Sequence, residues 1–202
     1  MATSPRRKPA IDRSRDAVLA SVTAILVDRP DASLAEIAQL VGIGRTTLHR
    51  LFPTRAAVLH AVARDAIDHL SGVYAQAGIP EAFLAHATES DSLEAFRRLV
   101  ELVVPLGPRL TFLLRARELE VDPAVNEELT ALDAILESAV ERGQGAGFLS
   151  SRAPASWLAE ALYALIYVAW EQIEDGTLAG LAAPGLVLDT WLSGVTVRDA
   201  RI

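Results

Sequence analysis

Hydrophobic residues recur at helical spacing in segment after segment of this chain. Between residues 12 and 28, for example, Leu19, Val22, Ile25 and Leu26 lie three or four positions apart, which places them on one face of a helix. Alternating runs of β-branched residues are missing, and proline or glycine recurs at helix-length intervals. The pattern therefore predicts an all-α protein.

Capping signals divide this pattern into separate helices. Ser33 and Glu36 have the spacing of a capping box, as do Asp91 and Glu94, and Thr54 is a favourable N-cap. A glycine-rich loop is expected over 143–147. The predicted helices cover residues 12–28, 34–40, 45–51, 54–78, 91–104, 108–119, 123–142, 154–174 and 184–195.

The two short helices within 34–53 are joined by a glycine-containing turn, which is typical of a helix-turn-helix. Gly42 stands just after the first helix, where the chain needs a left-handed residue. Ala38 stands where the two helices come closest. The apolar residues that are expected to face the core are Ile37, Val41, Ile43, Leu48 and Leu51.

The remaining residues of the second short helix are small, polar or cationic. Arginine can donate two hydrogen bonds to guanine, and threonine can contact a thymine methyl group. A recognition helix presents such side chains to the major groove. The predicted DNA contacts on this helix are Arg45, Thr46, Thr47, His49 and Arg50. The alternative is a basic, solvated helix face.

Three residues at helix starts are predicted to contact phosphate. Ser33 precedes the first short helix, while Thr54 and Arg55 open the long helix. Free backbone N–H groups at a helix start, together with a hydroxyl or a guanidinium, can bind a phosphate group. Plain N-capping is the alternative for Ser33 and Thr54, and it is compatible with a phosphate contact.

Charge is distributed unevenly along the chain. Residues 1–65 contain ten basic and six acidic side chains, which leaves nine basic and twenty acidic ones for residues 66–202. The first third can therefore meet a polyanion although the whole chain carries a net charge of −7. Residues 1–10 are expected to form a flexible basic arm, with Arg6, Arg7 and Lys8 near a minor groove or simply solvated.

Residues 10–65 resemble the DNA-binding region of the TetR (tetracycline repressor) family. The match consists of Ile37, Ala38, Gly42, Ile43, Thr47, Leu48, Phe52, Thr54, Arg55 and Leu59. Two positions depart from the family pattern, because His49 replaces a tyrosine and Leu51 replaces an aromatic residue or histidine. The resemblance implies a homodimer with a three-helix DNA-binding domain over 11–53, whose phosphate clamp extends to residue 55. Residues 54–202 would then form a helical regulatory and dimerisation domain.

The last two predicted helices, 154–174 and 184–195, are apolar on more than one face. A surface helix of a monomer has a single apolar stripe. We therefore expect a homodimer formed through these two helices, because a two-fold operator requires a two-fold protein. Burial within one chain is the alternative.

A site for a small organic effector is predicted from aromatic and cationic residues of the C-terminal region. The candidates are Phe112, Arg115, Trp157, Tyr163 and Tyr167. Apolar walls with a few polar groups suit such a molecule. Each candidate has an alternative role in the core, and Glu118 is an alternative ion-pair partner for Arg115.

Other classes of function find little support in the sequence. Cysteine is absent and the four histidines lie nine or more residues apart, so no metal site, catalytic residue or cofactor is expected. No apolar stretch is long enough to span a bilayer and no signal peptide is evident, which favours a cytoplasmic protein without membrane contact.

The sequence thus predicts a regulator, most simply a repressor, that binds double-stranded DNA at a palindromic operator and leaves it when an effector binds. Two alternatives stay open. One is a helix-turn-helix regulator without a small-molecule ligand, and the other is an all-helical enzyme or adaptor that does not bind DNA.

Overall fold

A computed structural model of the 202-residue chain describes residues 10–79, 88–116 and 123–195. The regular structure of the described residues consists of helices and contains no strand, so the prediction of an all-α fold is confirmed. The helices are α1 (Ala10–Asp28), α2 (Leu34–Val41), α3 (Arg45–Leu51), α4 (Arg55–Ala77), α5 (Glu89–Val103), η2 (Val104–Leu106), α6 (Gly107–Ala116), α7 (Pro123–Gly145), α8 (Ala155–Glu174) and α9 (Ala183–Val195).

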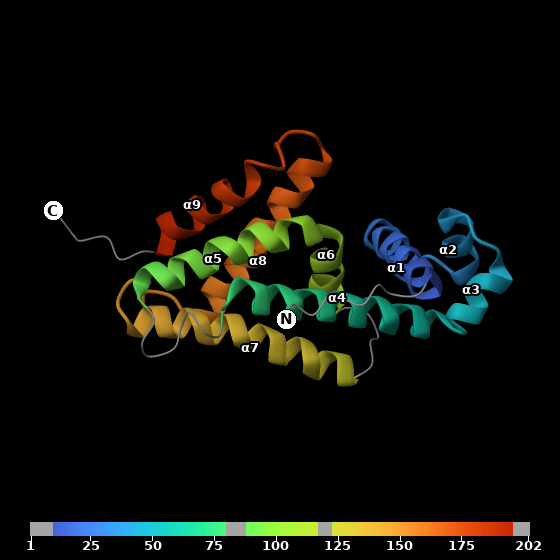
Figure 1. The fold of residues 1–202 in the computed structure, drawn as a ribbon, viewed down its shortest axis with the longest axis horizontal. Coiled ribbons are helices and arrows are strands. Elements are labelled where there is room, and N and C mark those ends of the chain that lie inside the picture. The colour runs from blue at the N-terminus through green and yellow to red at the C-terminus, as the bar shows by residue number, and fades with distance from the viewer. Residues whose placement is uncertain (1–9, 80–87, 117–122, 196–202) are drawn as a thin grey trace, which may run out of the picture.

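Helices α1, α2 and α3 gather at one end of the molecule, and the long helix α4 runs from this group into a larger helical body (Figure 1). The buried residues form one continuous core that includes Leu26 of α1, Val62 of α4 and Ile166 of α8. The basic arm predicted over 1–10 falls almost wholly outside the described residues.

Two of the three predicted capping signals start helices, and the third does not. Ser33 caps α2 in a capping box with Glu36, and Thr54 caps α4 by accepting a hydrogen bond from the Ala57 amide. Helix α5 begins earlier than predicted, because Thr88 is its cap and Asp91 takes the third position of the box. Thr88 and Asp91 have the same spacing as Asp91 and Glu94, so the chain contains two overlapping capping signals and the first one starts the helix.

Helix α7 extends through the first part of the loop predicted over 143–147 and ends at Gly145. Gly143 is buried, and a Cβ atom at this position would lie 2.6 Å from Leu149 Cδ1. The missing side chain lets the chain fold back so that the Leu149 amide donates to the Gly143 carbonyl at 3.1 Å. The glycine therefore serves close packing here and does not end the helix.

Candidate DNA-binding helices and effector cavity

Helix α3 is held by its one buried side chain, Leu48, which has an exposed fraction of 0%. Ile37 and Ala38 of α2 are also buried, and Phe52 packs behind α3 with the Arg15 guanidinium 5.8 Å from its ring centroid. These contacts fix which face of α3 points outward. That face carries exposed side chains only, namely Arg45, Thr46, Thr47, His49 and Arg50.

The turn between α2 and α3 depends on Gly42, whose φ of +77° lies in the left-handed region. Its N–H donates to carbonyls of the last turn of α2, and the Ile43 N–H donates to the Ala38 carbonyl at 3.0 Å. Carbonyls at the end of α2 are thereby satisfied while the chain turns sharply. The turn thus places α3 at a fixed angle to α2.

The hydroxyl of Ser33 is engaged within the chain. It accepts a hydrogen bond from the Glu36 amide at 3.3 Å and donates to Glu36 Oε2 at 2.6 Å. The hydrogen bond from the Ser33 side chain lowers the pKa of Glu36, so a carboxylate stands at the start of α2. Because a carboxylate repels phosphate, this geometry favours the N-cap alternative for Ser33. The Thr54 hydroxyl accepts from the Ala57 amide, which leaves its own proton available to a phosphate oxygen.

Arg55 is half-buried and contacts the loop between α1 and α2. Its Nε donates to the Ala32 carbonyl at 3.3 Å, and its Nη2 donates to the Pro30 carbonyl. These bonds join the first turn of α4 to the segment that precedes α2. They give Arg55 a structural role that the spacing in the sequence did not indicate.

A cavity of about 860 Å³ lies in the helical body between α6, α7 and α8. Ligand sites in proteins commonly have volumes of about 300–1,000 Å³. The lining residues are Leu70, Leu110, Leu113, Leu114, Leu129, Leu132, Asp133, Trp157, Glu160, Ala161, Tyr163, Ala164, Leu165, Tyr167 and Val168.

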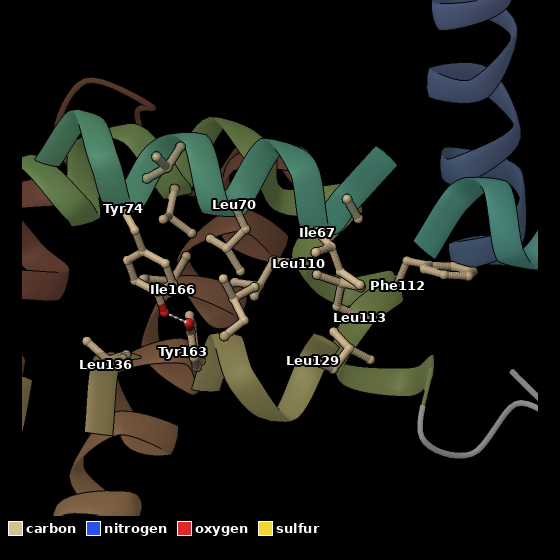
Figure 2. Packing of buried hydrophobic residues seen from close by; sticks show 14 of the residues in the cluster. Ile67, Leu70, Tyr74, Leu110, Phe112, Leu113, Leu129, Leu136, Tyr163 and Ile166 are labelled. Atoms are coloured by element: carbon tan, nitrogen blue, oxygen red, sulfur yellow. Dashed lines mark hydrogen bonds between the residues drawn. The ribbon is translucent and has the colours of Figure 1, made fainter. Parts of the chain in front are cut away.

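Three of the five predicted effector contacts, Trp157, Tyr163 and Tyr167, line this cavity. The other two do not. Phe112 is buried on a part of α6 away from Tyr163 (Figure 2). Arg115 donates through Nη1 to the Val27 carbonyl of α1 at 2.8 Å, a partner 88 residues away in the chain. Its alternative partner, Glu118, lies outside the described residues.

Tyr163, which lines the cavity, forms a buried pair with Tyr74, as Figure 2 shows. The hydroxyls of Tyr74 on α4 and Tyr163 on α8 are hydrogen-bonded to each other. Burial raises the pKa of both hydroxyls, and the nearby negative charge of Asp133 raises each pKa further. Both tyrosines therefore stay neutral at physiological pH.

The acidic side chains of the cavity wall give it a negative character. Among the lining residues that the structure describes, Asp133 and Glu160 are acidic and none is basic. Nearby on α8, Tyr167 donates to Glu171, and this hydrogen bond is the main cause of the raised pKa of Tyr167. The sequence prediction did not include Asp133 or Glu160. Glu160 lies three residues before Tyr163 on the same predicted helix, which would have been the signal, whereas no local signal links Asp133 to Tyr163.

The described parts of the chain offer no sign of metal binding or membrane insertion. His, Asp and Glu side chains nowhere gather in these parts as a group of three suited to a metal ion. Within the same ranges, no helix combines the length and the apolar character needed to cross a bilayer.

Comparison with known proteins places this architecture among regulators. The chain is 33% identical over 176 residues to the HTH-type transcriptional repressor LfrR of Mycolicibacterium smegmatis, covering 86% of this chain and 87% of LfrR. The solved structure of LfrR in complex with proflavine has a TM-score of 0.70 and 28% identity, covering 94% of this chain and all of the other. No family model matches the sequence.

More distant structures share the fold. The TetR-family regulator PfmR of Thermus thermophilus has a TM-score of 0.63 at 16% identity, covering 99% of this chain and all of the other. KstR2 of Mycobacterium tuberculosis has a TM-score of 0.65 at 14% identity, covering 92% of this chain and 96% of its own length. Since the identity to LfrR extends over most of both chains, the resemblance in residues 10–65 is confirmed for the molecule as a whole. The chain belongs to the TetR family, which consists of transcriptional regulators and not of enzymes.

Proposed function

We propose that this regulator is a cytoplasmic repressor that binds a palindromic operator as a homodimer and is released by a small aromatic cation. The observation that carries the DNA-binding part is the outward face of α3. Leu48 is fully buried while all five predicted contacts, from Arg45 to Arg50, are exposed. Two such helices about 34–36 Å apart would enter successive major grooves.

Within this proposal, Arg45 and Arg50 read base edges, while Thr46, Thr47 and His49 contact bases or phosphates. Thr54 donates to phosphate, whereas Ser33 contributes chiefly the amide groups at the start of α2. Arg55 keeps the proposed phosphate contact only with the part of its guanidinium that does not bind Pro30 and Ala32. We expect Arg45, Arg50 and Thr54 to contribute most of the affinity.

The DNA-binding proposal is tested with genomic fragments selected on the protein and then sequenced. Arg45→Ala or Arg50→Ala should weaken binding to a selected operator by about 5- to 150-fold, which corresponds to about 1–3 kcal/mol, and should relax the preference at one base pair. Arg98→Ala, an exposed arginine paired with Glu94 on α5, is the matched control. If all three variants bind the operator equally, the assignment of α3 is wrong.

The effector class follows from the composition of the cavity. Its walls are mostly aliphatic and aromatic, and its charged groups are the carboxylates Asp133 and Glu160. Such a site favours a flat, apolar molecule that carries positive charge. Proflavine, which was found bound to LfrR, is a planar aromatic cation.

Proflavine is therefore the probe for this part of the proposal. Its fluorescence should change on titration with the protein, and Glu160→Gln or Asp133→Asn should weaken binding severalfold because a charge partner is lost. Glu141→Gln changes an exposed carboxylate of α7 outside the cavity and should leave binding unchanged. Equal binding by all these variants would exclude a carboxylate-lined site. Complete absence of proflavine binding would favour the regulator without a small-molecule ligand.

The proposed homodimer uses the outer faces of α8 and α9. Leu186 of α9 is 54% exposed and does not line the cavity, whereas the exposed Trp157 and Val168 of α8 do. Helices α8 and α9 pack side by side, and Trp191 Nε1 donates to the Leu158 carbonyl at 3.0 Å. Their outer faces would form a four-helix interface with a second copy.

A further inference from the structure

Helix α6 lies between the cavity and the DNA-binding helices. Leu110, Leu113 and Leu114 line the cavity. The helix also packs against α1 and α4, and α1 packs mainly on α2, α4 and α6. Of the helices that pack extensively on α1, α6 contributes three cavity residues and α4 contributes one, Leu70. A ligand in the cavity therefore acts on α1 chiefly through α6.

Arg115, in the last turn of α6, connects this helix to α1. Its Nη1 donates to the Val27 carbonyl at 2.8 Å. Val27 lies in the last turn of α1, where backbone carbonyls have no partner within the helix. A guanidinium at this end of a helix also interacts favourably with the helix dipole. Arg115 thus joins the end of α1 to α6 by a charge-assisted hydrogen bond.

The same guanidinium lies beside a cavity residue of α8. Arg115 is close enough to the Tyr167 hydroxyl to oppose the rise in its pKa that Glu171 causes. Tyr167 lines the cavity and donates to Glu171. Arg115 therefore bonds to the end of α1 and also lies near the Tyr167 hydroxyl of α8.

The other end of α6 is fixed by tight packing. A Cβ atom on Gly107 would lie 2.0 Å from Cδ1 of Trp170, so the indole of α8 sits directly on the helix start. Two residues on, Arg109 Nε donates to Asp65 Oδ2 of α4 at 2.8 Å, and both side chains are largely buried. A displacement of α6 by a ligand is therefore concentrated at the end that carries Arg115.

We infer that Arg115 is a positioning residue for the response to effector: its bond to Val27 ties the cavity wall formed by α6 to the last turn of α1, so that a ligand that displaces α6 also displaces the DNA-binding domain. This inference rests on the proposed function, because it requires both an operator and a ligand of the cavity. Arg115 itself need not touch the ligand.

The test compares operator affinity with and without saturating proflavine in the wild-type chain, Arg115→Ala and Arg115→Gln. Coupling between two sites commonly changes affinity about 5- to 150-fold. We expect both variants to bind proflavine within about threefold of wild type, and the factor by which proflavine weakens operator binding to fall at least fivefold. Arg97→Ala, which removes an exposed ion-paired arginine of α5, is the matched control.

A second variant tests whether the coupling between effector and operator depends on the proximity of Arg115 to Tyr167. Tyr167→Phe removes the hydroxyl beside Arg115, so the losses of coupling in Tyr167→Phe and Arg115→Ala should be less than additive in the double variant. Additive losses, or undiminished coupling in both Arg115 variants, would overturn the inference. A general loss of packing at this position would lower stability without changing the ratio of the two operator affinities.

Hydrogen exchange without ligand separates this inference from the proposed function. The amide of Arg29 donates to the Ile25 carbonyl at 2.7 Å in the last turn of α1. We expect this amide to exchange faster in Arg115→Ala than in wild type, and unchanged exchange would contradict the bond to Val27. A wild-type chain that binds operator but not proflavine would refute the effector class, while the exchange measurement would still decide the role of Arg115.

Discussion

Gly42 and Gly72 show how one residue type has opposite effects at two positions. Gly42 has a φ of +77° at the end of α2, whereas Gly72 lies inside α4 with ordinary helical geometry. Neither position is crowded, because a Cβ atom would meet nothing within 4 Å at Gly42 and only Gln76 Nε2 at 3.9 Å at Gly72. The difference is therefore one of backbone conformation and not of space.

We predict that Gly42→Ala lowers the free energy of unfolding by about 1 kcal/mol, because an L-residue is strained in the left-handed region. Gly72→Ala should raise it by up to about 1 kcal/mol, because alanine restricts the unfolded chain and favours helix. Urea denaturation followed by circular dichroism measures both. A loss of stability in both variants, or in neither, would contradict this account.

The buried tyrosine pair predicts a stability change at alkaline pH. Burial raises the pKa of Tyr74 and Tyr163 above that of a tyrosine in the unfolded chain, about 10. The stabilisation of the neutral forms is therefore complete below about pH 10 and is lost as the pH rises further, by up to about 1.4 kcal/mol per pH unit for each group.

The double variant Tyr74→Phe/Tyr163→Phe should remove this part of the alkaline loss while changing stability at pH 7 only slightly, since both partners leave together. Either single variant should cost about 1–3 kcal/mol at pH 7, because one buried hydroxyl loses its partner. Thermal unfolding of the three variants between pH 7 and 11 measures both effects. An equally steep alkaline loss in the double variant would exclude the pair as its source.

At the scale of elements, sequence patterns predicted most helix bounds closely, because each pattern is local. Apolar spacing and capping residues lie within a few positions of each other, so α2, α4 and α9 begin and end within a residue or two of the prediction. The start of α5 was misplaced because two local signals competed, and the end of α7 was misplaced because packing by Leu149, just beyond the helix, decided the outcome.

The contact between α6 and α8 illustrates a constraint that no local pattern reveals. Gly107 looks like a helix breaker in the sequence, but its hydrogen atom makes room for the Trp170 indole. We predict that Gly107→Ala destabilises the fold by about 1–3 kcal/mol, because the added methyl group pushes α6 away from α8.

Two variants serve as controls for this prediction. Gly185→Ala in α9 has no neighbour within 4 Å of the added Cβ atom and should not destabilise. Adding Trp170→Leu should restore part of the stability lost in Gly107→Ala. Guanidinium denaturation of the four proteins measures this, and an unaltered midpoint for Gly107→Ala would contradict the packing argument.

At the scale of the whole molecule, the exposed face of α3 could be predicted more fully than the cavity. The residues of α3 lie within seven consecutive positions, so one motif contains them all. The cavity combines residues from Leu70 to Val168, and its contacts depend on how four helices pack. Aromatic character alone therefore found Trp157, Tyr163 and Tyr167 but misplaced Phe112, which is buried elsewhere.

The proposed dimer leads to a prediction about quaternary structure. Leu186→Glu places a charge in the apolar surface of α9 and should raise the dimer dissociation constant at least tenfold, with a parallel loss of operator affinity. Ile135→Glu, which changes an exposed apolar residue of α7, should leave the oligomeric state unchanged. Light scattering after size exclusion measures the mass, and a monomeric wild-type chain would refute the dimer.

The hydrogen bonds from Arg55 to the carbonyls of Pro30 and Ala32 lead to an expectation about operators with different half-site spacing. Arg55 bonds the first turn of α4 to the segment just before α2. A tilt of α4 would therefore move the DNA-binding helices together as one unit. Binding of the effector would then change the distance between the DNA-binding helices of the two protomers, while the arrangement of these helices within each protomer stays the same. Inserting one base pair between the half-sites should consequently change the ratio of operator affinities with and without effector. Altering the bases within a half-site should change this ratio less.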